Sequence, residues 1–163
     1  MSATSPAVIN GRNCYMGAQA PVLALIAFYA AFNDRDLAAM ERNWWTRDDE
    51  AVMANPLGGL RRGWPAIREV YARLFTGPAR VYVEFHDYTL HQAGELFYAV
   101  GRERGYFERD GRRIDLAIRT SRVFRKLDGR WQQVHHHGSI EDPALLDRYQ
   151  QVARGEPIQA GPA

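Results

Sequence analysis

The chain of 163 residues lacks several features that would assign it to a functional class. It has one cysteine, Cys14, so neither an internal disulfide nor a thiolate metal cluster can form. Charge of one sign is not in excess: 21 Lys and Arg residues oppose 19 Asp and Glu residues, and no basic block is present. We therefore expect no nucleic-acid partner.

Long hydrophobic runs are also missing. The longest apolar stretch, 21–32, is too short to span a bilayer, so we expect no membrane partner. The first residues contain no charged segment followed by an apolar run, which predicts no secretory signal and a cytoplasmic protein. There is no glycine-rich phosphate loop, no nucleophile elbow and no glycosidase-like carboxylate pair. We expect no cofactor.

The composition that remains is that of one globular domain with a sizeable core. Both ends are rich in Gly, Pro, Ser and Ala, which is typical of mobile segments. We therefore predict a flexible leader over 1–19, a single domain over 20–154 and a flexible tail over 155–163.

Hydrophobic periodicity predicts four helices and about five strands. The expected helix starts are Pro21, a cap at Asp34 or Asp36, Trp64–Pro65, and Asp142–Pro143. Strands are expected near 51–54 and then over 81–86, 96–108, 112–125 and 131–139. Asp-Gly pairs at 110–111 and 128–129 are strong hairpin signals. Helices followed by long antiparallel strands predict an α+β fold with a curved sheet covered by helices on one face.

Two stretches carry a resemblance to a known superfamily. FYAAFNDRDLAAM, followed by NPLGGLRRGWPAIREVYARL, resembles the first half of a ketosteroid isomerase. TSRVFRKLDGRWQQVHHHGS resembles still more the association (hub) domain of calcium/calmodulin-dependent protein kinase II and its bacterial SnoaL-like relatives. Both belong to the nuclear transport factor 2-like superfamily. The resemblance implies a cone-shaped curved sheet with a small-molecule pocket, here with an extra C-terminal helix.

The isomerase comparison argues against isomerase chemistry. The position of that family's carboxylate base is Asn55 here, and an amide cannot remove a proton from carbon. The hydroxyl donor on the first helix is replaced by Phe28, and the protonated aspartate falls near Thr120 or Ser121. Asn55 and Thr120 are kept as pocket candidates, with a plain turn role before Pro56 as the alternative for Asn55.

The hub comparison implies two pocket arginines, Arg102 and Arg122. A third falls on Gly138 in this chain, and the pocket histidine of the hub falls near Trp64. One interpretation is a clamp for a small carboxylate or similar anion. In the alternative, both arginines pair with internal acids. The acids considered are Glu84, Glu103 and Asp115.

Alternation adds that Tyr98 shares a strand face with Arg102, as Thr120 does with Arg122. We therefore expect Tyr98 in the pocket as well. Trp44 and Trp64 are either core residues or pocket lining that would favour an aromatic ligand.

Three consecutive histidines, 135–137, raise the question of a metal site. On a strand, His135 and His137 point to one face and His136 to the other, so all three cannot bind one ion. We expect no metal, with His135 and His137 on the convex face and His136 directed inward. His136 is then the acid–base candidate of the pocket, or a structural histidine.

Three functions remain open. The first is binding of a small anionic or aromatic molecule in an enclosed pocket. The second is a lyase, cyclase or isomerase of a small hydrophobic metabolite that uses His136. The third is an oligomerisation module. Under each of them we expect a homodimer, because a long convex sheet face would otherwise meet water.

Overall fold

The computed structural model describes residues 6–13 and 19–157. Three helices precede the long strands: α1 (Ala20–Asn33), α2 (Leu37–Asn43) and α3 (Gly63–Thr76). Pro21 occupies the first turn of α1, where its missing N–H costs nothing. Asp36 caps α2, because its side chain accepts a hydrogen bond from the backbone N–H of Ala39. The expected helix starts are therefore confirmed to within a residue or two.

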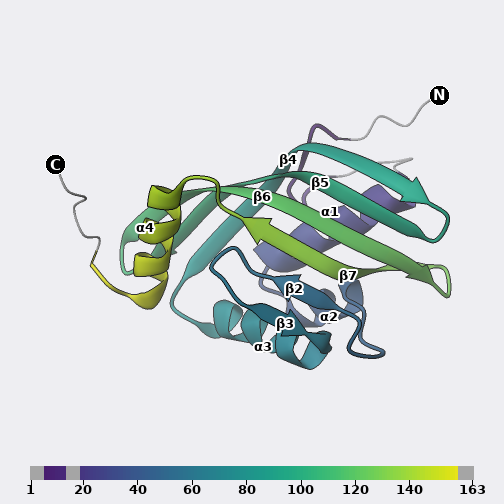
Figure 1. Ribbon diagram of the computed structural model, residues 1–163, viewed down its shortest axis with the longest axis horizontal. Helices are drawn as coiled ribbons and strands as arrows, with labels where there is room; N and C mark the ends of the chain where they lie inside the picture. The colour runs from purple at the N-terminus through teal and green to yellow at the C-terminus, as the bar shows by residue number, and fades with distance from the viewer. Residues whose placement is uncertain (1–5, 14–18, 158–163) are drawn as a thin grey trace.

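One seven-stranded sheet forms the second layer (Figure 1). Its strands follow the spatial order β1-β4-β5-β6-β7-β2-β3. Their bounds are β1 Val8–Ile9, β2 Val52–Ala54, β3 Leu60–Arg62, β4 Arg80–Ala93, β5 Leu96–Arg109, β6 Arg112–Leu127 and β7 Arg130–Ser139. All pairings are antiparallel except that of β2 with β7. A fourth helix, α4 (Pro143–Arg154), follows β7.

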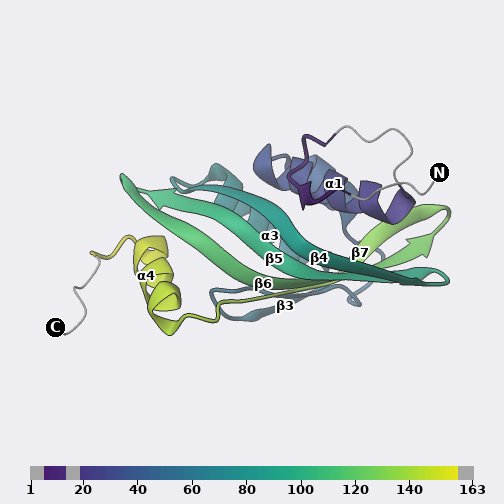
Figure 2. The ribbon, with the colours of Figure 1, turned by 90° about the horizontal axis from the view of Figure 1, so that it is seen from above.

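The sheet is strongly bent, as the view from above shows (Figure 2). Register shifts interrupt β4 between His86 and Thr89 and the β6–β7 pair at Val123 and Phe124. Gly105 in β5 has a φ of 150°, and a Cβ there would lie 2.0 Å from the carbonyl oxygen of Tyr82. Only glycine permits this close approach of the two strands.

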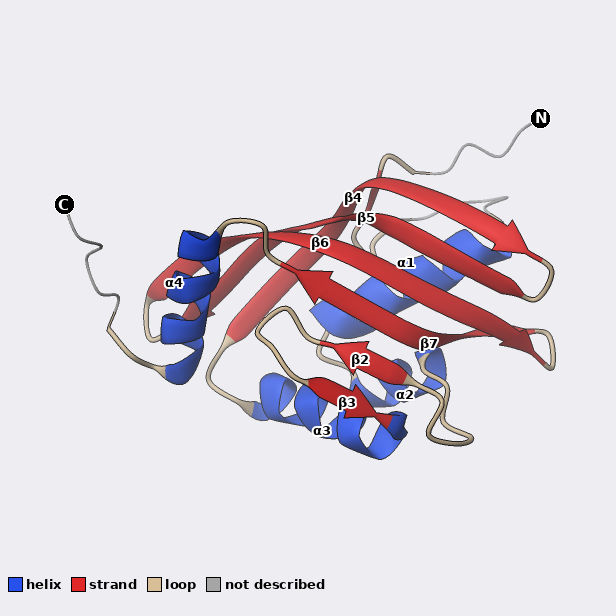
Figure 3. Ribbon diagram, in the orientation of Figure 1, coloured by secondary structure: helices blue, strands red, loops and turns tan. Residues whose placement is uncertain are grey.

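Helices α1, α2 and α3 lie along one side of the sheet, and α4 stands at the end that carries the β5–β6 turn (Figure 3). The core between the layers is rich in aromatic rings. Phe28 and Tyr29 of α1 are edge-to-face at 5.1 Å, and Tyr29 stacks on Phe85 of β4 at 5.6 Å. The α+β fold with a curved, unclosed sheet and a C-terminal helix is as the sequence predicts.

Two short strands were not expected. Val8 and Ile9 lie in the segment assigned to a flexible leader, yet they pair with β4 and Ile9 is fully buried. Residues Leu60–Arg62, assigned to a loop, pair with β2. Cys14 and most of the predicted tail lie outside the described residues. None of the helices in the described part of the chain is long and apolar enough to cross a bilayer.

Candidate functional site

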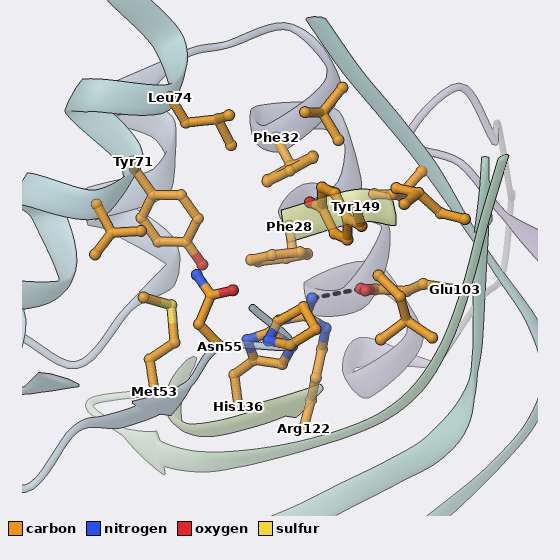
Figure 4. A pocket seen from close by; sticks show the side chains of 16 residues that line it. Phe28, Phe32, Met53, Asn55, Tyr71, Leu74, Glu103, Arg122, His136 and Tyr149 are labelled. Atoms are coloured by element: carbon orange, nitrogen blue, oxygen red, sulfur yellow. Dashed lines mark hydrogen bonds and ion pairs between the residues drawn. The ribbon is translucent and has the colours of Figure 1, made fainter. Parts of the chain in front are cut away.

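A cavity lies between the helices and the inner face of the sheet. Its volume is about 80 Å³, several times the space that one water molecule needs. Its wall is mostly apolar, with side chains from three helices and five strands (Figure 4). The lining residues are Phe28, Phe32, Met53, Asn55, Pro56, Val70, Tyr71, Leu74, Val81, Val83, Glu103, Leu116, Ile118, Arg122, His136 and Tyr149.

A buried ion pair forms one wall. Arg122 on β6 donates from Nη2 to Oε1 of Glu103 on β5 at 2.7 Å, and both side chains are at most 6% exposed. Arg122 Nη1 donates to Gln133 Oε1 at 2.7 Å. The hydroxyl of Tyr29 donates to the same Glu103 oxygen at 2.8 Å. The face of Phe28 lies 3.6 Å from the guanidinium carbon, a cation–π contact.

This network holds its charges without an external partner. Burial lowers the pKa of Arg122, but its interactions with Tyr29 and Glu103 outweigh burial and hold that pKa above its ordinary value. Burial likewise raises the pKa of Tyr29 well above its usual range, so its hydroxyl remains a donor. The guanidinium and the carboxylate therefore neutralise each other inside the wall.

His136 on β7 reaches the same cavity and is only 7% exposed. Neither ring nitrogen has a hydrogen-bond partner among the described residues. Burial and the nearby Arg122 charge lower the pKa of His136 well below its ordinary value, so the imidazole is neutral at physiological pH. A neutral imidazole has one N–H donor and one acceptor nitrogen, and both are available here.

Asn55 lies after β2, at the edge of the cavity opposite the ion pair (Figure 4). Its Oδ1 accepts from the backbone N–H of Leu57 at 3.1 Å, which is an Asx turn before the Pro56 bend. Tyr71 of α3 also lines the cavity, and burial raises its pKa to about 12. Both interpretations of Asn55 therefore hold: it forms the turn and it lines the pocket.

The geometry can be compared with known proteins. The family model of the SnoaL-like domain matches residues 23–143. The chain belongs to the SnoaL-like domain family. No curated protein matches it.

Solved structures agree on the fold of this SnoaL-like chain. A protein of Streptomyces avermitilis, proposed as a dehydratase of the nuclear transport factor 2-like family, has a TM-score of 0.67 at 20% identity. That alignment covers 74% of this chain and 92% of the other.

Two further structures are similar. A proposed calcium/calmodulin-dependent protein kinase type II association domain from Thiobacillus denitrificans has a TM-score of 0.61 at 26% identity, covering 75% and 95% of the two chains. An uncharacterised protein with a cystatin-like fold from Caulobacter vibrioides has a TM-score of 0.62 at 20% identity, covering 83% and 96%.

Arg102 is the main correction to the predicted site. Its side chain is 48% exposed on the outer face of the sheet, where Nη1 lies 3.1 Å from Glu141 Oε2. Register explains the error: β5 and β6 pair Ala99 with Arg122 and Arg102 with Arg119, so the two arginines point to opposite faces. The two-arginine clamp is not formed, and Arg122 pairs with an internal acid instead.

Several other candidates also lie away from the cavity. Tyr98 is 41% exposed on the outer face, where its ring stacks on that of His91 at 5.1 Å. Trp44 and Trp64 are buried in the core and do not line the cavity. Thr120 is buried on β6, also outside the cavity wall. Of the predicted pocket residues, the structure brings together Arg122, His136 and Asn55.

The other two histidines of the run lie as expected. His135 and His137 are on the face opposite His136, next to Val52 and Ala54 of β2. The described residues contain no group of three side chains suited to hold a metal ion.

Three of the cavity residues with polar side chains were not predicted as binding residues: Glu103, Tyr71 and Tyr149. Glu103 was considered only as an internal acid that pairs with an arginine, and the two tyrosines lie within the predicted helices. For Glu103 a signal exists, since it shares a strand face with the apolar Phe97, Ala99 and Phe107. A carboxylate on such a face needs a buried cationic partner.

Proposed function

We propose that this SnoaL-like chain binds a small, uncharged, mainly apolar molecule with a hydroxyl or carbonyl group. The observation that carries the proposal is His136. Of the buried side-chain polar atoms without a partner among the described residues, only its two nitrogens belong to the cavity wall. A buried polar group without a hydrogen bond costs stability, so a ligand that supplies the bond gains affinity.

The ligand is uncharged because the wall is already neutral. Arg122 is paired with Glu103 and also bonded to Gln133. An anion would have to be desolvated and placed beside the Glu103 carboxylate, with no unpaired cation to compensate. An aromatic body suits the cavity, because Phe28, Phe32 and Tyr71 line it.

Three compounds with one ring test this directly: phenol, toluene and benzoate, titrated calorimetrically at pH 7. We expect phenol to bind about fivefold more tightly than toluene, from one hydrogen bond of about 1 kcal/mol, and benzoate to bind least. In His136→Phe the preference for phenol should vanish. His137→Phe, on the outer face, is the matched control and should keep it.

Two results would refute the proposal. If benzoate binds most tightly of the three, the cavity is an anion site after all. If His136→Phe keeps the preference for phenol, His136 does not bind the ligand's hydroxyl. Turnover of a bound hydroxylated compound would instead make the chain an enzyme. Catalysis by His136 would require a second polar side chain that acts on the same substrate. No described side chain hydrogen-bonds to His136.

We also propose that the chain forms a homodimer through the outer face of the sheet. Five large apolar side chains are exposed in the described part of the chain, and four of them lie on the sheet. Tyr98 and Val100 stand on β5 beside Leu96, and Leu60 of β3 lies in the same cross-strand row as Val100. Such an apolar face is typical of an interface.

Light scattering after size exclusion tests the dimer. Wild type should run at twice the chain mass, and Val100→Glu should shift it to the monomer, since a carboxylate would be buried between two sheets. Leu23→Glu, an equally exposed apolar residue of α1, should leave the dimer intact. A wild-type monomer contradicts the proposal. A larger ring would favour an assembly role, as the name of the Thiobacillus association domain suggests.

A further inference from the structure

Helix α4 lies beyond the part of the chain that matches the family domain. The SnoaL-like match ends at residue 143, where α4 begins. The helix has clear ends: Asp142 caps its start by accepting from the backbone N–H of Ala144 at 2.9 Å. Gly155 ends it in the left-handed region, with a φ of 77°. The cavity wall formed by α4 therefore lies beyond the range of the domain match.

Three contacts fix α4 against the rest of the molecule. Arg109 of β5 donates to the carbonyl oxygen of Ala153, and Arg112 of β6 donates to that of Glu156 just beyond the helix. From the helix side, Gln150 donates to the carbonyl oxygen of Leu57 at 3.3 Å. The helix is thus held both to the β5–β6 hairpin and to the loop that carries Asn55.

The inner face of α4 places Tyr149 in the cavity wall. Leu145, Tyr149 and Val152 are buried at helical spacing, and the Tyr149 ring lies 5.0 Å from that of Phe107. Tyr149 is 7% exposed, and Figure 4 shows its hydroxyl directed toward the side of Phe28. That hydroxyl makes no hydrogen bond within the described residues, although packing on Phe107 would need only a ring. Burial raises the pKa of Tyr149, so the hydroxyl stays protonated.

We propose that Tyr149 is a ligand-binding residue, and that the ligand carries two oxygen functions. One is held by His136 and the other by the Tyr149 hydroxyl. This rests on the proposed binding function and narrows its ligand class to uncharged compounds with two hydroxyl or carbonyl groups on one apolar frame. The Tyr149 ring is buried and its hydroxyl faces the cavity, so a ligand there can supply a hydrogen bond that no described side chain makes to it.

Four probes that share one ring separate this inference from the proposed function: phenol, catechol, resorcinol and hydroquinone, titrated without oxygen. Wild type should bind at least one diol about threefold to tenfold more tightly than phenol, the contribution of one added hydrogen bond. In Tyr149→Phe this preference should fall to about one, with phenol affinity unchanged. Tyr106→Phe, on the outer face of β5 and away from the cavity wall, should behave as wild type.

The outcomes are distinct. Suppose that phenol binding depends on His136. If wild type then shows no diol preference, or if Tyr149→Phe keeps that preference, the role of Tyr149 is overturned and the proposed function stands. No binding of any of the four overturns the proposed function and this inference with it. Equal weakening of all four, with a lower melting temperature, would make Tyr149 a packing residue only. Should Tyr149→Phe not fold, the ¹³Cζ resonance of Tyr149 in wild type gives the answer: it must shift with the preferred diol and not with phenol.

Discussion

His136 makes the stability of this protein depend on pH in a way that can be calculated. In the folded state, burial and the Arg122 charge lower its pKa well below the ordinary value of 6.5. Below pH 6.5 the unfolded chain therefore binds a proton that the folded chain does not. Stability from the neutral imidazole is complete above pH 6.5 and is lost as pH falls toward the lowered pKa.

The magnitude follows from one proton. Each pH unit below 6.5 costs about 1.4 kcal/mol for as long as the folded imidazole stays neutral. Allowing for partial protonation near 6.5, wild type should lose about 1.4 kcal/mol between pH 7.5 and 5.5 through this group. His136→Phe should lose none of it. The variant should also gain stability at pH 7.5, since it removes two unpartnered buried nitrogens.

Urea unfolding at half-unit steps from pH 7.5 to 5.5 measures this difference. His135, whose pKa is also lowered by burial, is present in both proteins and cancels when one curve is subtracted from the other. The free-energy difference between wild type and His136→Phe should widen by about 1.4 kcal/mol toward acid. Parallel curves for the two proteins would show that the imidazole is charged or solvated, and would refute the reasoning.

Two further predictions concern the scaffold around the cavity. Glu103→Gln leaves the Arg122 charge buried without its partner and should lower the free energy of unfolding in urea by about 3–5 kcal/mol. Glu141→Gln breaks only the exposed pairs with Arg102 and Arg119 and should lower it far less. Equal losses for the two variants would contradict the burial argument. Gly105→Ala should cost more than Gly94→Ala in thermal unfolding, because an added carbon meets the Tyr82 carbonyl at 2.0 Å in the first and nothing within 4 Å in the second; equal melting temperatures would show that β4 and β5 can separate.

Local patterns predicted the long elements well, since their signals are contained within each segment. Alternation over β4 to β7 and helical spacing in α1 and α3 reflect one buried face apiece. The strands β1 and β3 have two and three residues, too few for a period to show. They exist because β4 and β2 offer open edges to them, which is information held elsewhere in the chain.

The prediction of the site was wrong at one step, the register between the neighbouring strands β5 and β6. Alternation shows which residues of one strand share a face, but not which face of the next strand they share. The signal was nevertheless present. A hairpin closed by Asp110–Gly111 pairs Arg109 with Arg112, and counting back along both strands pairs Arg102 with Arg119. That count alone places Arg102 and Arg122 on opposite faces.

Hydrogen-bond satisfaction separates the scaffold of the cavity from its binding groups. Glu103 and Arg122 are buried and charged, yet each is bonded to protein, so they shape and stiffen the wall. Other buried polar atoms without a partner in the described structure, such as Trp44 Nε1, lie outside the wall of this cavity. In the described wall of the cavity, His136 and Tyr149 each present a polar group to the open space, and the two belong to different elements. A ligand that joins them would therefore link the sheet to α4, so its binding should stabilise α4 as well as the cavity.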